Sequence, residues 1–419
     1  MIKTKTITYI VIAIVIVVLV SALALYYFTP RRPTLGVQEI KIGVILPLSG
    51  PYAILGEEEK KGYEMAMEEI NGKGGVLGVP LKLIIEDNQG KPEVSVSAAE
   101  KLVTIDKVVA IAGEYMSSCT YALLSALRKY SPPPIAVLIG GSTDSIEKDF
   151  GSEEWFFHLH PYAYIYQSTI RDWLLTLQPR PKTIFLAYEK TAYGTSQAGY
   201  AKEYLSKAGF TIVGEEPFTS GAADQTPLVL KAKASNPDVF LWIGYAGDSI
   251  VIVRNAKQVG FKPKLLLDTV GVGFPEFQTS LGKDAEYVCG IEVWSPAVNY
   301  KTGPPFPITH TSEWVAKYEK KYGKEPDYWS LLAYTNLYVI ADAIERAGTL
   351  ERGALIKALE KTDLQSPIGR VKWVPGQFVS RPHQAEFAMK MVIFQWQGGK
   401  KVVLYPKEVA TGTVIYPMP

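Results

Sequence analysis

The sequence contains few residues of the types that bind metals or form disulfides. Its 419 residues include two cysteines and four histidines. Cys119 and Cys289 lie far apart and form no CxxC motif, which leaves open a disulfide or two buried free thiols. His158 and His160 would share one side of a strand, but no third ligand is near in sequence, which favours a structural role over a zinc site. We therefore predict that the protein has no cofactor and no metal.

The chain also lacks an excess of either charge. Its 44 lysines and arginines nearly balance 42 aspartates and glutamates, and no long basic run follows the first forty residues. Nucleic acid is therefore disfavoured as a partner. A hydrophobic content of 47% with a net charge of +2 excludes a disordered chain. The length is typical of two or three domains.

Motifs for phosphate binding and acyl transfer are missing as well. Neither Gly-x-Gly-x-x-Gly nor Gly-x4-Gly-Lys-Ser/Thr follows a predicted strand, which removes the usual phosphate-binding loops. The chain has no Gly-x-Ser-x-Gly motif to present a nucleophilic serine. We therefore predict that the protein is not an enzyme.

The amino-terminal part of the chain is strongly apolar. Residues 7–28 carry no charge, and these 22 residues suffice for a helix across a bilayer, which takes roughly 20. A cleavable signal peptide has an apolar core of only about 7–15 residues. Residues 1–28 are thus predicted to be a transmembrane anchor, with cleavage after Ala24 as the alternative. Residues 29–39, which include two prolines, are predicted to be a stiff linker to a body outside the cytoplasm.

From residue 40 onward, predicted strands and helices alternate, which is typical of a doubly wound α/β fold. The first strand is a continuous apolar run, as expected for a strand buried in a parallel sheet. The predicted strands of a first lobe are 41–46, 81–87, 108–113 and 135–140. A second series, which predicts another lobe of similar size, has strands 183–188, 211–215, 239–244 and 264–268.

The pattern changes after residue 307, where helices are predicted at 314–322, 331–347 and 354–359 without a strand between them. Such a segment is expected to cover an existing sheet, and we assign it to the first lobe. Strands resume at 371–374 and 387–395. The prediction is therefore two Rossmann-like lobes, 40–160 with 291–368 and 161–290 with 369–419. Three crossings near His160, Gly290 and Gly369 would form a hinge, with a ligand crevice between the lobes.

Short motifs follow one another through this body in a particular order. They are Ile42-Gly43-Val44, Ser49-Gly50-Pro51, Ile70 to Gly78, Ser117 to Thr120, Lys190 to Gly194 and Gly244-Tyr245 to Gly260. Together they resemble the Leu/Ile/Val-binding group of periplasmic binding proteins, which have the type I, Venus-flytrap fold. The resemblance covers residues 40–397. It implies an extracytoplasmic component of an ABC importer that captures a branched-chain or similar amino acid by hinge closure. ABC permease subunits are the implied partners.

The resemblance also assigns ligand contacts. In the family, a serine that opens a helix and a small-residue loop after the next strand hold the ligand carboxylate, and Ser117 and Gly140-Gly141-Ser142 match these positions. The residue types suit that role independently, because a helix amino terminus presents free N–H groups and glycines let a backbone approach an anion. A serine at this place is equally typical of a plain helix cap.

The second lobe supplies two aromatic positions in the resemblance, which Tyr193 and Tyr245 match. Each follows a predicted strand, where a doubly wound lobe has its ligand face. Asp268, at the end of another strand, is the candidate partner for a ligand ammonium, although an acid there is also typical of a turn. Whether Tyr52 or Leu55 lines the pocket stays open.

Two other functions remain open. The first is an amide- or urea-binding receptor of the same fold, whose ligand lacks the full zwitterion. The second is a ligand-sensing ectodomain that acts through a membrane partner. Both keep the two lobes and the crevice; the first changes the ligand, and the second changes what closure of the lobes achieves.

Overall fold

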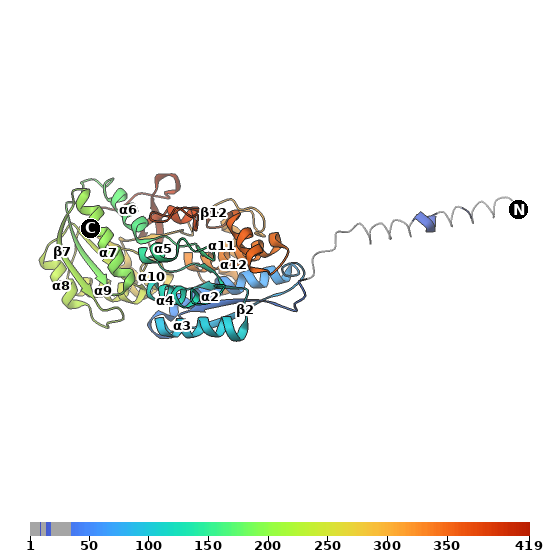
Figure 1. Cartoon of the computed structure of the whole chain (residues 1–419). Helices are drawn as coiled ribbons and strands as arrows, with labels where there is room; N and C mark the ends of the chain where they lie inside the picture. Colours follow the sequence, from blue (N-terminus) through green and yellow to red (C-terminus); the bar gives the residue numbers. More distant parts are fainter. Residues whose placement is uncertain (1–8, 10–13, 18–34) are drawn as a thin grey trace.

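The computed structural model describes residues 9, 14–17 and 35–419. Two lobes make up the body, each built around one β-sheet (Figure 1). The predicted anchor, except residues 9 and 14–17, and linker residues 29–34 lie outside the described residues. Within the described part of the chain, no helix combines the length and the apolar character needed to cross a membrane.

The first lobe contains an eight-stranded sheet in the order β11-β12-β13-β5-β4-β3-β1-β2. Neighbouring strands from β2 to β13 pair in parallel, and β12 and β11 add antiparallel pairs at one edge. The bounds are β1 Ile40–Leu46, β2 Leu81–Asp87, β3 Ala110–Gly113, β4 Ile135–Leu138, β5 Phe156–His158, β11 Asp363–Ser366, β12 Gly369–Val374 and β13 Gln384–Ala385. The apolar run predicted as the first strand is thus an interior, buried strand that pairs on both sides, as a parallel sheet covered on both faces requires.

The second lobe contains a seven-stranded sheet in the order β15-β14-β10-β9-β8-β6-β7. Its strands from β7 to β10 are parallel, and β14 and β15 are antiparallel. The bounds are β6 Thr183–Glu189, β7 Thr211–Phe218, β8 Val239–Ile243, β9 Leu265–Asp268, β10 Val288–Glu292, β14 Val392–Gln397 and β15 Lys400–Tyr405.

Helices cover both sheets (Figure 1). In the first lobe they are α2 Ala53–Gly72, α3 Pro92–Lys101, α4 Ser117–Leu127, α5 Asp144–Phe150, α11 Thr311–Tyr322, α12 Tyr328–Ala347 and α13 Arg352–Glu360. In the second lobe they are α6 Ala163–Leu174, α7 Ala192–Lys207, α8 Thr226–Ala234, α9 Ala246–Gln258 and α10 Pro275–Leu281. Helix α12 packs along α2 and against β3 and β4, so the helical segment after residue 307 covers the first sheet.

The chain passes between the sheets three times, and the third crossing differs from the prediction. It leaves the first sheet after β5 and the second sheet after β10, close to His160 and Gly290. The crossing predicted at Gly369 is wrong. Gly369 instead follows a two-residue turn that joins β11 to β12 as a hairpin, and β12 pairs with β13 inside the first sheet. The chain recrosses only between β13 and β14, beyond Ala385.

The strand predicted over residues 387–395 also starts too early. Residues Glu386–Met389 form a 3-10 turn, and β14 begins at Val392. The two cysteines lie in different lobes, Cys119 in α4 and Cys289 in β10, and both are free and buried. Each therefore acts as a small apolar side chain in its own lobe.

Candidate functional site

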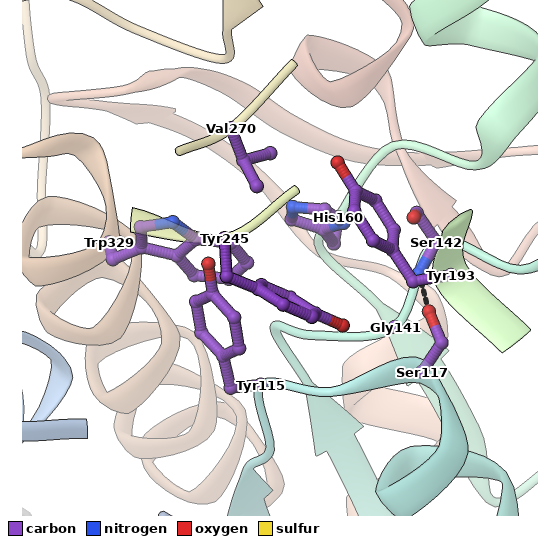
Figure 2. Close-up of a pocket in the computed structure, with 9 residues that line it drawn as sticks. All are labelled: Tyr115, Ser117, Gly141, Ser142, His160, Tyr193, Tyr245, Val270 and Trp329. Carbon is purple, nitrogen blue, oxygen red and sulfur yellow. Dashed lines mark hydrogen bonds between the residues drawn. The ribbon is translucent and has the colours of Figure 1, made fainter. Parts of the chain in front are cut away.

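A small pocket lies between the two lobes (Figure 2). Its lining residues are Tyr115, Ser117, Gly141, Ser142, His160, Tyr193, Tyr245, Val270 and Trp329. All of them except Trp329 come directly after the carboxyl ends of parallel strands: β3, β4 and β5 in the first lobe, and β6, β8 and β9 in the second. This edge is where open α/β sheets bind ligands, and here two such edges face each other.

Five of the residues assigned from sequence meet at this pocket, namely Ser117, Gly141, Ser142, Tyr193 and Tyr245. Gly140 and Asp268 do not line it. The helix-start serine and the loop after β4 come from the first lobe, and the two tyrosines come from the second. The residues that the resemblance linked to one ligand are therefore neighbours in space.

Ser117 holds the loop that follows β4. Its Oγ accepts a hydrogen bond from the backbone N–H group of Ser142 at 3.0 Å (Figure 2). It also accepts one from the backbone N–H group of Thr143 at 3.3 Å. A hydroxyl oxygen has two acceptor sites and one donor hydrogen. With both acceptor sites occupied, the Ser117 hydroxyl is left to donate, and two incoming N–H bonds polarise it further. The buried Ser142 Oγ has no partner among the described residues.

Helices α4, α7 and α9 begin at the pocket, and they differ in how their first turns are capped. Glu189 accepts from Thr191 and from the backbone N–H of Gly194 at the start of α7. Asp248 accepts from the backbone N–H of Tyr245 at the start of α9. The residue before α4, Met116, offers no side-chain cap. The first turn of α4 therefore receives no side-chain cap from its N-cap residue, and Glu114, just before the helix, accepts from the backbone N–H of Tyr115 instead.

The glycines of the loop after β4 serve close packing. A Cβ built on Gly140 would lie 1.8 Å from the carbonyl oxygen of Glu114, so the two strand ends touch backbone to backbone. Gly141 has φ +86°, and its Cβ would lie 2.6 Å from Ile146 Cδ1. Gly140 thus positions the pocket without lining it, and Gly141 supplies the left-handed conformation that turns the chain toward Ser117.

Aromatic rings form most of the pocket wall. The Tyr115 ring lies 4.3 Å from that of Trp329 and 5.9 Å from that of Tyr245, while Tyr193 and Tyr245 are 5.3 Å apart. His160 stacks on Trp329 at 4.7 Å with planes 16° apart. The cavity between these rings has a volume of about 10 Å³, close to the space for one water molecule. A larger ligand therefore fits only when the rings that line the cavity, or the lobes that carry them, move apart.

Polar atoms without partners are concentrated in this wall. Among the described residues, the Tyr115 and Tyr245 hydroxyls, His160 Nδ1 and Trp329 Nε1 are buried and make no hydrogen bond. Burial raises the pKa of both tyrosines well above 10 and lowers the pKa of His160 well below 6.5, so all three are neutral. Since buried polar groups are nearly always hydrogen-bonded in folded proteins, these atoms are suited to meeting a ligand.

Asp268 lies at the end of β9, behind the pocket wall. Its Oδ2 accepts from Ser249 Oγ at 2.7 Å, and its Oδ1 has no partner within the described residues. Burial raises the pKa of this carboxyl to about 7, although hydrogen bonds from Ser249 and the Thr269 backbone oppose the rise. The residue that lines the pocket from this strand end is Val270, two positions later.

Four lining residues were not assigned from the sequence: Tyr115, His160, Val270 and Trp329. Tyr115 and Val270 follow β3 and β9, so the strand-end rule that selected Tyr193 and Tyr245 would also have found them. His160 follows β5, a strand of three residues, and was predicted to have a structural role. Trp329 stands in the first turn of α12, where Asp327 caps the backbone N–H of Trp329 at 2.7 Å, and no local pattern links it to the pocket.

Around the pocket the lobes touch through polar contacts. Tyr52 reaches across from the first lobe, with its hydroxyl 3.3 Å from Ser220 Oγ and its ring 5.2 Å from that of Tyr245. On another side, Ser196 Oγ donates to Asp144 at 2.9 Å. Tyr52 thus belongs to the contact between the lobes. Neither Tyr52 nor Leu55 is among the residues that line the pocket.

Comparison with known proteins agrees with this architecture. The family model described as periplasmic binding protein matches residues 39–401. A curated relative, Leu/Ile/Val-binding protein homolog 7 of Brucella abortus (strain 2308), is 30% identical over 394 residues, which cover 90% of this chain and 94% of the relative.

Solved structures share the fold. The branched-chain amino acid transporter substrate binding protein LivJ of Streptococcus pneumoniae, in complex with isoleucine, has a TM-score of 0.75 and 22% identity. The alignment covers 88% of this chain and 100% of that one. A solute binding protein of an ABC transporter from Rhodopseudomonas palustris BisB5, in complex with 3,4-dihydroxybenzoic acid, has a TM-score of 0.73 and 19% identity. The alignment covers 91% of this chain and 99% of that one. The lobes, the three crossings and the family match together show that this chain belongs to the periplasmic binding proteins of type I fold.

Proposed function

We propose that this protein is the extracytoplasmic solute-binding component of an ABC importer and that it captures a small organic carboxylate between its lobes. The observation that carries the proposal is the pocket itself. Strand ends of two sheets face each other there, with an uncapped helix start and a free Ser117 hydroxyl on one side and tyrosine rings on the other. The carboxylate binds at Ser117, Gly141 and Ser142, and Tyr193 and Tyr245 close over it.

The mechanism is capture by closure of the lobes. A ligand that contacts Ser117 in the first lobe and Tyr245 in the second gains contacts in the closed state that the open state lacks. Binding therefore shifts the population toward the closed state, which presents one composite surface to the permease. This pocket has no reacting pair of residues to assign, and the family is one of binding proteins.

Similar proteins with bound ligands support the carboxylate. The Brucella relative bears the name of a Leu/Ile/Val-binding protein, and LivJ of Streptococcus pneumoniae was solved with isoleucine. The Rhodopseudomonas palustris protein was solved with 3,4-dihydroxybenzoic acid. Amino acids and hydroxybenzoic acids differ in most of their structure and share one carboxylate. Amides and urea lack that group, and we place them second.

Substitution of Ser117 by alanine tests the carboxylate placement. The change removes a hydroxyl that donates to the anion and leaves two N–H groups unpaired. We expect the binding free energy of the ligand to weaken by about 1.5–3 kcal/mol, which makes the dissociation constant about 10- to 100-fold higher. A thermal-shift screen of carboxylates, amino acids, amides and urea identifies the tightest ligand. Isothermal titration of the full-length protein in detergent with that ligand then measures the change in the dissociation constant.

Ser125→Ala is the matched control, because Ser125 lies in the same helix, is half-buried outside the pocket lining and bonds only to the backbone of its own helix. Its dissociation constant should equal that of the wild type. Equal affinity of Ser117→Ala and wild type would show that the carboxylate is not held at the start of α4. Tighter binding of urea or a simple amide than of every carboxylate would favour the amide receptor instead.

We also propose that the apolar segment 7–28 tethers the protein to the membrane. Its support is the run of 22 uncharged residues, which is longer than the core of a cleavable signal. The mature protein should fractionate with membranes, and its intact mass should include residues before Ala24. A soluble form that begins at residue 25 would show cleavage after Ala24 instead.

A further inference from the structure

The residues that line the pocket carry no charge. The described lining set consists of aromatic residues, serines, a glycine, a valine and His160, which burial keeps neutral. A carboxylate does not need a cation here, because the start of α4 and the hydroxyls of Ser117 and Ser142 supply donors. An ammonium is different, since burying one without a nearby carboxylate costs several kcal/mol.

Val270 is the residue that lines the pocket from the loop after β9. It follows β9 and faces the pocket opposite the rings of Tyr115 and Trp329 (Figure 2). Its side chain offers only methyl groups. The other acids near the second-lobe wall, Glu189 and Asp248, are both used as helix caps and accept several hydrogen bonds each.

Asp268, at the end of β9, is a further acid near the second-lobe wall. It is buried behind the wall, with Oδ2 held by Ser249, and its loop turns back so closely that a Cβ on Gly271 would lie 2.7 Å from the same oxygen. Asp268 does not line the pocket, and Val270 stands in its place there. The Oδ2 atom is therefore used inside the loop after β9, while Oδ1, which has no partner among the described residues, belongs to a residue outside the pocket lining.

The rest of the wall suits a neutral, ring-bearing group. Three tyrosines, Trp329 and His160 present ring faces and edges, and aromatic pairs gain about 0.5–1.5 kcal/mol beyond the area they bury. The unpartnered hydroxyls of Tyr115 and Tyr245 add neutral hydrogen-bonding atoms beside these rings. Aliphatic surface is limited to Val270 in the described lining.

From this arrangement we infer that the ligand is an aromatic carboxylate without an ammonium group, bound by its carboxylate at α4 and by its uncharged ring against the aromatic wall of Tyr115, Tyr245 and Trp329 once the wall has moved to admit it. This inference rests on the proposed function and names the ligand class of the same pocket. It replaces the zwitterionic amino acid that the resemblance implied.

Matched ligand pairs test the inference on the wild-type, full-length protein. 3-Phenylpropanoate and phenylalanine differ only in the ammonium, as do 3-(4-hydroxyphenyl)propanoate and tyrosine. We expect the ammonium-free member of each pair to bind at least about 100-fold more tightly in isothermal titration, because an unpaired buried ammonium costs several kcal/mol.

Val270→Glu is the gain-of-function variant. An acid at this lining position should shift the preference toward phenylalanine by at least about 10-fold, because the ammonium then has a partner. Val270→Gln has the same length without the charge and reports the effect of size alone. The wild-type comparison does not depend on either variant folding.

The outcomes separate the inference from the proposed function. If phenylalanine binds the wild type as tightly as 3-phenylpropanoate or more tightly, the inference is wrong while the proposed function stands. Loss of that phenylalanine binding in Asp268→Asn would then identify Asp268 as the ammonium partner. If no carboxylate and no amino acid binds, both the inference and the proposed function are wrong.

Discussion

Replacement of Lys401 by methionine is expected to lower the free energy of unfolding by about 3–5 kcal/mol. Lys401 Nζ lies 2.8 Å from Glu292 Oε2, and both side chains are almost fully buried, with exposed fractions of 2% and 0%. The pair joins β15 to the end of β10, where the chain leaves the second lobe. Methionine keeps the packing against the Phe394 ring and leaves the Glu292 carboxylate without its partner. Urea denaturation followed by tryptophan fluorescence measures the change.

The loss should depend on pH. Burial raises the pKa of Glu292 to about 7, and the Lys401 ammonium opposes that rise. Without Lys401 the pKa of Glu292 in the folded protein rises further. In the unfolded chain Glu292 is an ordinary carboxyl, which releases its proton above about pH 4.5, whereas the folded variant still holds that proton. A group whose pKa is higher in the folded protein than in the unfolded chain contributes its full stabilisation at a pH below its pKa in the unfolded chain. This stabilisation is lost as the pH rises through the pKa of the group in the folded protein. The deficit of Lys401→Met should therefore be larger at pH 8 than at pH 5.

Two further variants make this prediction decisive. Lys400→Met changes the exposed neighbour and should stay within about 0.5 kcal/mol of the wild type. The double variant Glu292→Leu with Lys401→Met removes both buried charges and should recover most of the lost stability. A single variant as stable as the double variant, at pH 8, would show that the ion pair does not have the assigned role.

Replacement of Gly140 by alanine should damage both stability and binding. The added Cβ would lie 1.8 Å from the Glu114 carbonyl oxygen and 2.6 Å from Tyr115 Cα, atoms of a backbone that cannot rotate away. Overpacking of this kind costs about 1–3 kcal/mol. The displaced segment carries Tyr115 and leads into Ser117, so we also expect at least a 10-fold weaker ligand affinity, by the loss of about 1.4 kcal/mol or more. Denaturation and isothermal titration measure the two effects.

Gly199→Ala is the matched control. Gly199 is an exposed glycine inside α7, and a Cβ there would meet nothing within 4 Å. Alanine should stabilise that helix by about 0.5–1 kcal/mol and leave the affinity unchanged. If Gly140→Ala matched this control in both measurements, the close approach of the two strand ends would have no role in shaping the pocket.

Much of the candidate site could be predicted because its parts follow strand ends. Ser117, Ser142, Tyr193 and Tyr245 each stand a few residues after an apolar run, and the carboxyl ends of parallel strands gather at one edge of a sheet. Asp268 met the same criterion, yet the side chain turns into the loop behind the wall. Sequence position places a residue at the correct edge, whereas side-chain direction depends on the loop that follows.

The helical segment after residue 307 shows the same limit on a larger scale. Its helical spacing and lack of strands indicated that it covers a sheet, and α12 does pack on the first one. That it brings Trp329 into the pocket depends on the contact of α12 with α2, where a Cβ on Gly62 would lie 2.0 Å from the Ser330 carbonyl oxygen. Gly369 was misassigned as a crossing because a glycine in a hairpin turn and one in a hinge have the same local sequence character.

The sequence by itself determined the two lobes, the absence of the usual catalytic motifs and the strand ends that carry Ser117 and Tyr245. These properties follow from periodicity and local residue types, which act over a few turns or strands. Only the tertiary structure decided that Val270 rather than Asp268 faces the pocket, that Trp329 completes its wall, and that the third crossing lies beyond Ala385. These depend on contacts between segments far apart in the chain, and no local pattern encodes which of two nearby side chains points inward.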